Sequence, residues 1–205
     1  MIKDRNIDPL GISSTKLRAE QTYIILKPDV AVDSIVASGD VSAALPVATL
    51  AKEELDYPRN LLYTLTDASG SALTGTFTVV GTDQFGDSVT ETTDVTYAAA
   101  VSGTQIFATI VSIAVGSLSG EAASDTCDVG VSVEADVASF GLPCEISAVT
   151  DVKRVNFLNA GVTEMQNIDS TSVVIARNCF RPEQTVVVDD DYIITYKSTT
   201  EDINS

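Results

Sequence analysis

The sequence contains no histidine and no tryptophan, and both absences limit the function. Without histidine, the Ser-His-Asp and Cys-His mechanisms are excluded, and so are the usual zinc sites. Chemistry by carboxylates or lysine is not excluded. Because histidine is the commonest general acid and base in enzymes, we expect a protein without catalytic activity or a cofactor.

Cysteine is also scarce, with three residues at Cys127, Cys144 and Cys179. An odd count at wide spacing argues against a disulfide framework and against a CxxC metal site. We expect buried thiols in a protein from a reducing compartment.

Long apolar runs are missing as well. The longest candidate covers residues 107–116 and is far shorter than the roughly 20 residues that span a bilayer. The first eleven residues, "MIKDRNIDPLG", are polar and lack the apolar segment of a secretory signal. We therefore expect no membrane partner.

Basic residues are few and unevenly placed. The chain has 12 Lys and Arg against 29 Asp and Glu, for a net charge of −17, and residues 60–151 contain twelve acidic residues and no basic one. Such a surface repels nucleic acid, so we expect no nucleic-acid partner. Residues 1–27 hold five basic residues against three acidic ones. This leading segment either docks on an acidic partner or is a solvated tail.

The patterns that are present are those of β-structure. Hydrophobic residues make up 44% of the chain, which is enough for a core. Strand-like runs recur about every ten residues with turn signals between them, and no helical apolar stripe persists. The clearest run, residues 126–134, places Cys127, Val129, Val131 and Val133 on one face and Asp128, Gly130, Ser132 and Glu134 on the other.

These patterns predict a mainly β protein, an antiparallel β-sandwich of the Ig-like or jelly-roll-like kind with extended terminal arms. We expect an N-terminal arm over 1–20, a sandwich domain over 21–197 and a C-terminal tail over 198–205. A short helix is expected near residues 47–56, before Pro58. The expected strands lie within 21–27, 59–66, 74–81, 88–97, 104–116 (one long or two short), 126–134, 145–161 (one or two) and 170–179.

The stretch "GTDQFGD" (81–87) is the first candidate site. Asp83 and Asp87, with Asp94 beyond them, could supply oxygens to calcium, but their spacing does not match an EF-hand. A hairpin turn fits better, with Gly86 at positive φ and the aspartates bonded to nearby amides. In that turn Phe85 would fold back over the core. We expect a turn and no metal.

The second candidate is the run Asp189, Asp190 and Asp191. Residues 184–196 resemble a hairpin with these aspartates at its tip. A turn could aim two of them at one ion, but a solvated tip that discourages edge pairing is the better interpretation. The adjacent basic pair Lys153 and Arg154 is interpreted as a surface or interface feature.

Four segments together resemble a β-sandwich domain of tailed-bacteriophage virion proteins, namely small head-decoration (cement) proteins and related capsid or tail accessories. In chain order they are "PRNLLYTLTD", "TGTFTVVGTDQFGDSVTET", "GTQIFATIVSIAVG" and "FGLP". The likeness covers residues 59–143, about 85 of 205 residues. Residues 1–57 and 144–205 resemble nothing that we can name.

The resemblance implies a structural virion protein without catalysis. It would decorate the exterior of an icosahedral capsid, after synthesis in the host cytoplasm, with the major capsid protein and copies of itself as partners. Around a threefold axis the copies would form a closed trimer. The basic residues of the leader, Lys3, Arg5, Lys16 and Arg18, are the expected capsid contacts.

Two alternatives stay open at this stage. One is a tail, neck or fibre-base component of the same class of particle. The other is an adhesin-like binding module whose acidic loops hold calcium.

Overall fold

The computed structural model describes most of the chain between residues 20 and 198. The described ranges are 20–26, 28–41, 54–70, 72–143, 146–159, 162–167, 173–174, 179–182, 185–186 and 190–198.

All regular structure in these ranges is β-strand. None of their segments forms a helix that could cross a membrane. The strands are β1 (Glu20–Leu26), β2 (Val36–Asp40), β3 (Glu54–Arg59), β4 (Leu61–Thr66), β5 (Thr74–Thr82), β6 (Ser88–Thr96), β7 (Val101–Ser102), β8 (Phe107–Ser119), β9 (Thr126–Val131), β10 (Phe140–Gly141), β11 (Ile146–Asn159), β12 (Val162–Asn167), β13 (Val173–Val174), β14 (Cys179–Phe180) and β15 (Asp190–Ser198).

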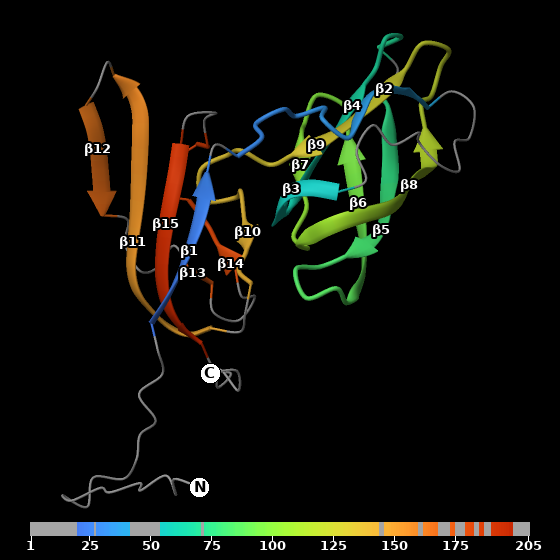
Figure 1. Ribbon diagram of the computed structural model, residues 1–205. Coiled ribbons are helices and arrows are strands. Elements are labelled where there is room, and N and C mark those ends of the chain that lie inside the picture. Colours follow the sequence, from blue (N-terminus) through green and yellow to red (C-terminus); the bar gives the residue numbers. More distant parts are fainter. Residues whose placement is uncertain are drawn as a thin grey trace, which may run out of the picture.

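The strands pair into three antiparallel sheets. One has the order β1-β15-β11-β12, the second β13-β14-β10-β3-β8-β5-β6, and the third β2-β9-β4-β7. Figure 1 shows that they form two lobes side by side. The prediction of a mainly β, antiparallel, sandwich-like fold is confirmed.

The central lobe is a sandwich in which β2, β9, β4 and β7 pack against β3, β8, β5 and β6. Its hydrophobic core is drawn wholly from residues 35–129. Strict alternation builds it: in β5 the even-numbered threonines are half-buried, while Phe77 and Val79 are fully buried. In β9 the predicted inward residues Cys127, Val129 and Val131 are likewise fully buried.

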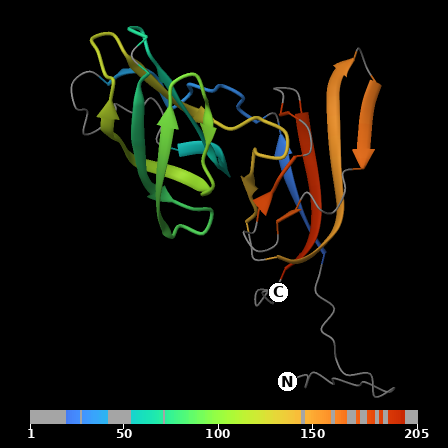
Figure 2. The same ribbon diagram turned by 180° about the vertical axis from the view of Figure 1, so that it is seen from behind.

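The terminal lobe takes its residues from both ends of the described chain. The β1-β15-β11-β12 sheet packs on the short strands β10 and β14 around a second, smaller core. Three stacked or tilted rings dominate this core, those of Phe140, Phe180 and Tyr192. The chain therefore starts in the terminal lobe, builds the central lobe, and returns (Figure 2). A second core was not anticipated from the sequence.

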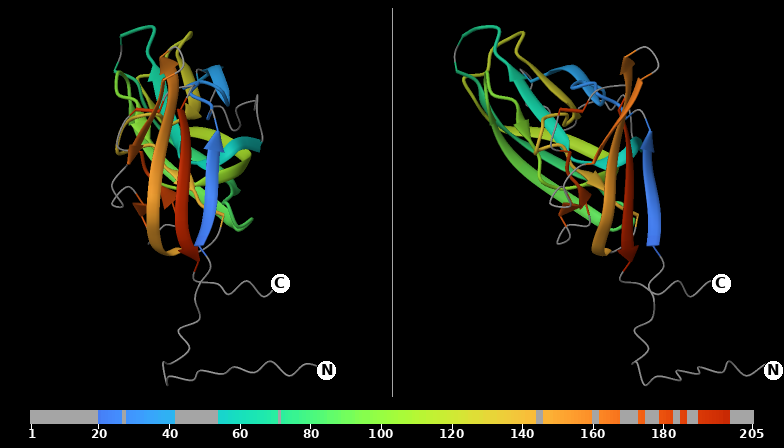
Figure 3. Two further views of the ribbon diagram at one scale, coloured as in Figure 1. Left: turned by 60° about the vertical axis from the view of Figure 1, so that its left-hand side comes forward. Right: turned by 90° about the vertical axis from the view of Figure 1, so that its left-hand side faces the viewer.

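The ends of β1 and β15 lie together, because Glu20 pairs with Lys197. The start of β1 and the end of β15 therefore lie at the same end of one sheet (Figure 3). The expected arms lie outside the described residues. The first and last described strands reach Glu20 and Ser198, one residue beyond each predicted domain boundary.

Several local predictions are corrected by the structure. Residues 54–56 belong to β3 rather than to a helix, because Leu55 is buried and Glu54 pairs with Thr109. The expected outward residues Gly130 and Ser132 are buried, and the backbone of Val32 lies against Gly130. The expected strand over 170–179 is represented by the two-residue strands β13 and β14.

Candidate functional site

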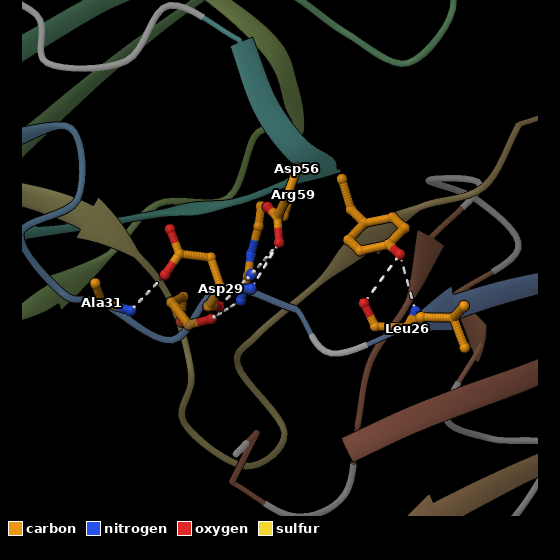
Figure 4. Close-up of polar contacts among 7 residues, drawn as sticks. Leu26, Asp29, Ala31, Asp56 and Arg59 are labelled. Carbon is orange, nitrogen blue, oxygen red and sulfur yellow. Dashed lines mark hydrogen bonds and ion pairs between the residues drawn. The ribbon is translucent and has the colours of Figure 1, made fainter. Parts of the chain in front are cut away.

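The two lobes meet at Arg59, the last residue of β3, whose side chain is fully buried. Its Nη1 donates a hydrogen bond to the Asp29 carbonyl at 2.6 Å, and its Nη2 donates to the Ser132 carbonyl at 2.9 Å (Figure 4). Asp29 lies in the connection that enters the central lobe, and Ser132 lies in the one that leaves it. One guanidinium group therefore fastens both connections.

The electrostatic environment of Arg59 is mixed. Burial lowers its pKa to about 10, although the carboxylates of Asp56 and Asp29 favour the charged form. Nη1 lies 3.9 Å from Asp56 Oδ2, and the guanidinium carbon lies 4.5 Å from the ring centre of Phe140, in the terminal core. The contact with Phe140 is a cation–π interaction. Two carboxylates, two backbone carbonyls and a ring thus surround the buried charge.

Asn60, the next residue, uses every polar group it has to bind the connection that leaves the central lobe and the loop between β7 and β8. Its Nδ2 donates to the carbonyls of Gly103 and Val137, at 2.9 and 3.1 Å. Its Oδ1 accepts from Ser139 N at 2.8 Å. Its backbone N–H donates to the Ser139 carbonyl, and its carbonyl accepts from Ser132 N. Asparagine offers both donors and acceptors, which this site requires.

Two further side chains of β3 hold the end of β1. The Tyr57 hydroxyl accepts a hydrogen bond from Leu26 N at 2.9 Å and lies 3.1 Å from the Leu26 carbonyl, to which it donates. Asp56 Oδ2 accepts from Asp29 N at 2.6 Å, and Asp29 Oδ1 accepts from Ala31 N at 2.9 Å. Figure 4 shows both groups of contacts beside Arg59. β3 is therefore bonded along its length to the chain entering the central lobe.

A buried carboxylate supports the same region from β6. Glu91 Oε1 accepts from Thr104 N at 2.5 Å and Gln105 N at 3.1 Å, and Oε2 accepts from the Tyr63 hydroxyl at 2.8 Å. Burial, together with the nearby Glu91 charge, raises the pKa of Tyr63 above its ordinary value. A side chain at Gly103 would collide with Glu91, so glycine is required there. Glu91 thus fixes the loop whose Gly103 carbonyl Asn60 binds.

The β5–β6 hairpin reaches the terminal lobe through Gln84. A Cβ placed on Gly141 of β10 would meet the Gln84 amide at 3.0 Å and the Ile106 side chain at 2.8 Å. The absence of a side chain at Gly141 lets the hairpin loop pack directly on β10. Gln84 Oε1 is buried and has no hydrogen-bond partner among the described residues.

The four motifs quoted from the sequence therefore meet in one region of the structure. Arg59 and Asn60 open the first, Gln84 and Glu91 lie in the second, Gly103 opens the third, and "FGLP" supplies Phe140 and Gly141. Two of these contacts join one motif to another through backbone groups, namely Asn60 with the Gly103 carbonyl and Glu91 with the Thr104 and Gln105 amides. What this arrangement does physically is hold the two lobes in a fixed relation.

The turn predicted at "GTDQFGD" is confirmed. Asp83 Oδ1 accepts hydrogen bonds from Phe85 N at 2.8 Å and Asp87 N at 3.0 Å, and Gly86 has φ of +85°. The prediction for Phe85 is wrong, because its side chain is 44% exposed. Asp94 instead accepts a hydrogen bond from Thr76 Oγ1 on the neighbouring strand.

The prediction for the aspartate run is wrong where the structure describes it. Asp190 and Asp191 begin β15, in the middle of a sheet, with Asp191 paired to Leu26 on one side and Val155 on the other. Asp191 is buried rather than solvated. Asp189 lies outside the described residues.

The remaining candidate residues are not brought together. Lys3, Arg5, Lys16 and Arg18 lie outside the described residues. Lys153 and Arg154 lie in β11, where Lys153 pairs with Ile193. Within the part of the chain that the structure covers, no three acidic or cysteine side chains cluster as metal ligands would.

The sequence did contain one signal for this site. In β6 the inward positions are Val89, Glu91, Thr93 and Val95, so Glu91 is the one charged residue on this face of the strand. Such a residue must find buried partners. Nothing comparable marks Arg59 or Asn60, because their partners are backbone groups of distant segments.

Comparisons with protein-family models, with curated proteins and with solved structures found no match to this chain.

Proposed function

We propose that this protein is a structural virion protein that decorates and stabilises the icosahedral capsid of a tailed bacteriophage. It would bind major capsid protein subunits on the capsid exterior and form a trimer around a threefold axis. The observation that carries the proposal is that the first of the quoted motifs contacts the third and the fourth at the Arg59–Asn60 joint, through the Asn60–Gly103 hydrogen bond and the Arg59–Phe140 contact. Because the residues that carry the resemblance build the framework of the fold, the resemblance concerns the architecture of the domain and not only its turns.

The position of the two ends supports the same function. Glu20 and Lys197 are paired, so the strand ends next to the expected arms, one of which has four basic residues, lie side by side. Two extended segments from one place can cover much shell surface per residue. With many copies on one particle, modest affinity at each site is sufficient.

The direct experiment is to purify the virions and locate the chain by mass spectrometry and cryo-electron microscopy. We expect many copies on the outer capsid surface at threefold positions. A ring at the neck or tail would support the tail component instead, and a chain missing from virions would overturn the proposal.

The role of the leader has a separate test. Removing residues 1–19 leaves β1 whole, so we expect the truncated protein to fold normally and to bind emptied capsids more weakly. Its matched control replaces Lys3, Arg5, Lys16 and Arg18 with glutamine at full length. Undiminished capsid binding by both variants would show that the leader is not the anchor.

A further inference from the structure

Among the strands that the structure describes, β1 is an edge strand without the usual protection against pairing. It is the outermost strand of its sheet, and its pairing with β15 runs without a bulge over seven residues (Figure 3). Ile24 and Leu26 on its outer face are 47% and 54% exposed, and Ile24 lies opposite Ile193. A long, regular, aliphatic edge of this kind is a site for strand addition.

The Tyr57 contacts show which backbone groups of β1 are open. Leu26 directs both its N–H and its carbonyl to Tyr57, away from β15. In an antiparallel strand these groups alternate in direction from residue to residue. The N–H and carbonyl groups of Ile24, Thr22 and Glu20 therefore also point to the open edge. Tyr57 closes the edge at Leu26 and leaves three residues for a partner.

The other edges in the described part of the chain differ from β1. β12 has a register shift in its pairing with β11, and β2 has one in its pairing with β9 together with a positive φ at Ser38. β7 and β13 have two residues each. β6 is long and regular, but its outward residues are Thr90, Thr92, Asp94 and Thr96. Only β1 combines length, regularity and aliphatic side chains.

We propose that β1 pairs antiparallel with β1 of a second copy of this chain, around a twofold axis at Thr22. In this register Thr22 of one copy faces Thr22 of the other, and Glu20 faces Ile24. All three open residues of each copy are then satisfied, and the pairing ends where Tyr57 closes the edge. A self-complementary contact of this kind is isologous, as twofold interfaces are.

Charge and side chains are compatible with this contact despite the net charge of −17. Glu20 is the only charged residue in β1, and the two copies of Glu20 lie at opposite ends of the paired segment, about 13 Å apart along the strands. That exceeds the screening length of about 8 Å at physiological salt. The exposed side chains of Ile24 from the two copies extend one aliphatic face.

This dimer is a state of the free protein and does not depend on the proposed capsid function. The proposed trimer is a state on the shell and needs other contacts. A chain that never binds capsids can still pair through β1, and a capsid protein can fail to pair.

The test is sedimentation equilibrium of the full chain and two variants at Thr22. Thr22→Pro removes an N–H that points to the open edge, which β1–β15 pairing does not use. Thr22→Val is the matched control, since it keeps that donor. We expect a wild-type dimer, a dimer in Thr22→Val, and a dissociation constant more than about tenfold higher in Thr22→Pro, because two intermolecular hydrogen bonds are lost.

Amide hydrogen exchange of the wild-type protein gives a readout without any substitution. The Thr22 and Ile24 amides should become protected as protein concentration rises, while the Val79 amide should not change. A wild-type monomer at about 100 μM, a wild-type trimer, or edge amides with exchange independent of concentration would overturn the proposal.

Discussion

The two lobes of this protein differ in whether they are built from one continuous stretch of the chain or from separate stretches. Every core residue of the central lobe lies between Ile35 and Val129, so the lobe is built from one continuous stretch. The terminal lobe joins Ile25 to residues 138–194, across the whole length of that stretch. Its strands can pair only after the chain between them has been closed into a loop, and a folded central lobe reduces the entropic cost of that closure. The stability of the terminal lobe therefore depends on the folded central lobe, and the contacts of Arg59 and Asn60 link the two.

The most direct test of this difference between the lobes is to truncate one large side chain in each core. Phe77 and Phe140 are both fully buried, the first in the central lobe and the second in the terminal lobe. Each Phe→Ala change should cost about 3–5 kcal/mol. In thermal unfolding followed by circular dichroism, Phe77→Ala should lower one common transition, because both lobes require the central core.

Phe140→Ala should instead separate a low transition of the terminal lobe from a nearly unchanged transition of the central lobe. If Phe140→Ala lowers a single transition shared by both lobes, as Phe77→Ala does, then each lobe requires the other. The one-way dependence of the terminal lobe on the central lobe would then be wrong.

Removal of the Arg59 side chain tests the joint between the lobes. Arg59→Ala leaves the Asp29 and Ser132 carbonyls without their donor and opens a cavity beside Phe140, at a cost of about 3 kcal/mol. Arg59→Met fills that cavity without burying a charge, so we expect it to lose less. Chemical denaturation gives both values. Equal losses would mean that the hydrogen bonds, rather than packing, dominate.

The Tyr63 hydroxyl tests the support that the central lobe gives to the joint. Tyr63→Phe leaves Glu91 Oε2 without its donor and should cost about 2 kcal/mol at neutral pH. Because the loop at Thr104 and Gln105 is bonded to the same carboxylate, its amides should exchange faster in the variant. Thr92→Ala, at an exposed outward position of β6, is the control and should change stability by less than about 0.5 kcal/mol.

The loss of folding stability at alkaline pH should report on the core of the central lobe. Burial raises the pKa of the Cys127 thiol from 9.0 to about 11. Stability from this group is complete below pH 9 and is lost as pH rises toward 11, because the unfolded thiol ionises first. We expect a loss of about 1 kcal/mol by pH 10 and a smaller loss in Cys127→Ala, measured relative to pH 7. If stability falls as steeply with pH in Cys127→Ala as in the wild type, ionisation of Cys127 does not explain the loss.

The smallest expected effect is at the turn of the β5–β6 hairpin. Asp83→Ala removes the acceptor of two turn amides and should cost about 1 kcal/mol. Asp87→Ala should change stability by less than about 0.5 kcal/mol, because no described hydrogen bond uses its side chain. Addition of calcium should leave the difference in stability between the two variants unchanged. A calcium-dependent gain in stability that Asp83→Ala abolishes would favour a metal site.

Prediction from sequence succeeded where local chemistry decides the structure. The strands β5 and β6, the inward face of β9 and the turn at Gly86 depend on strand periodicity and on the conformational range of glycine. Local composition favours a helix near residues 47–56, but at residues 54–56 pairing of β3 with β8 overrides that preference.

The terminal lobe and the joint could not be predicted in this way. Asp191 looked like a hairpin tip because adjacent aspartates are usually solvated, and only the pairing of β15 with two strands explains its burial. The partners of Arg59 and Asn60 are backbone carbonyls and amides, which have no side-chain signature in the sequence.

Native-state hydrogen exchange of the wild-type protein under mild denaturant tests the dependence of the terminal lobe on the central lobe most directly. We predict that the amides of Ile25, Tyr192 and Ile194 exchange through an opening of lower free energy than those of Phe77, Val79 and Ile113, which exchange only on global unfolding. A terminal lobe that stays protected while the central lobe opens would contradict the account.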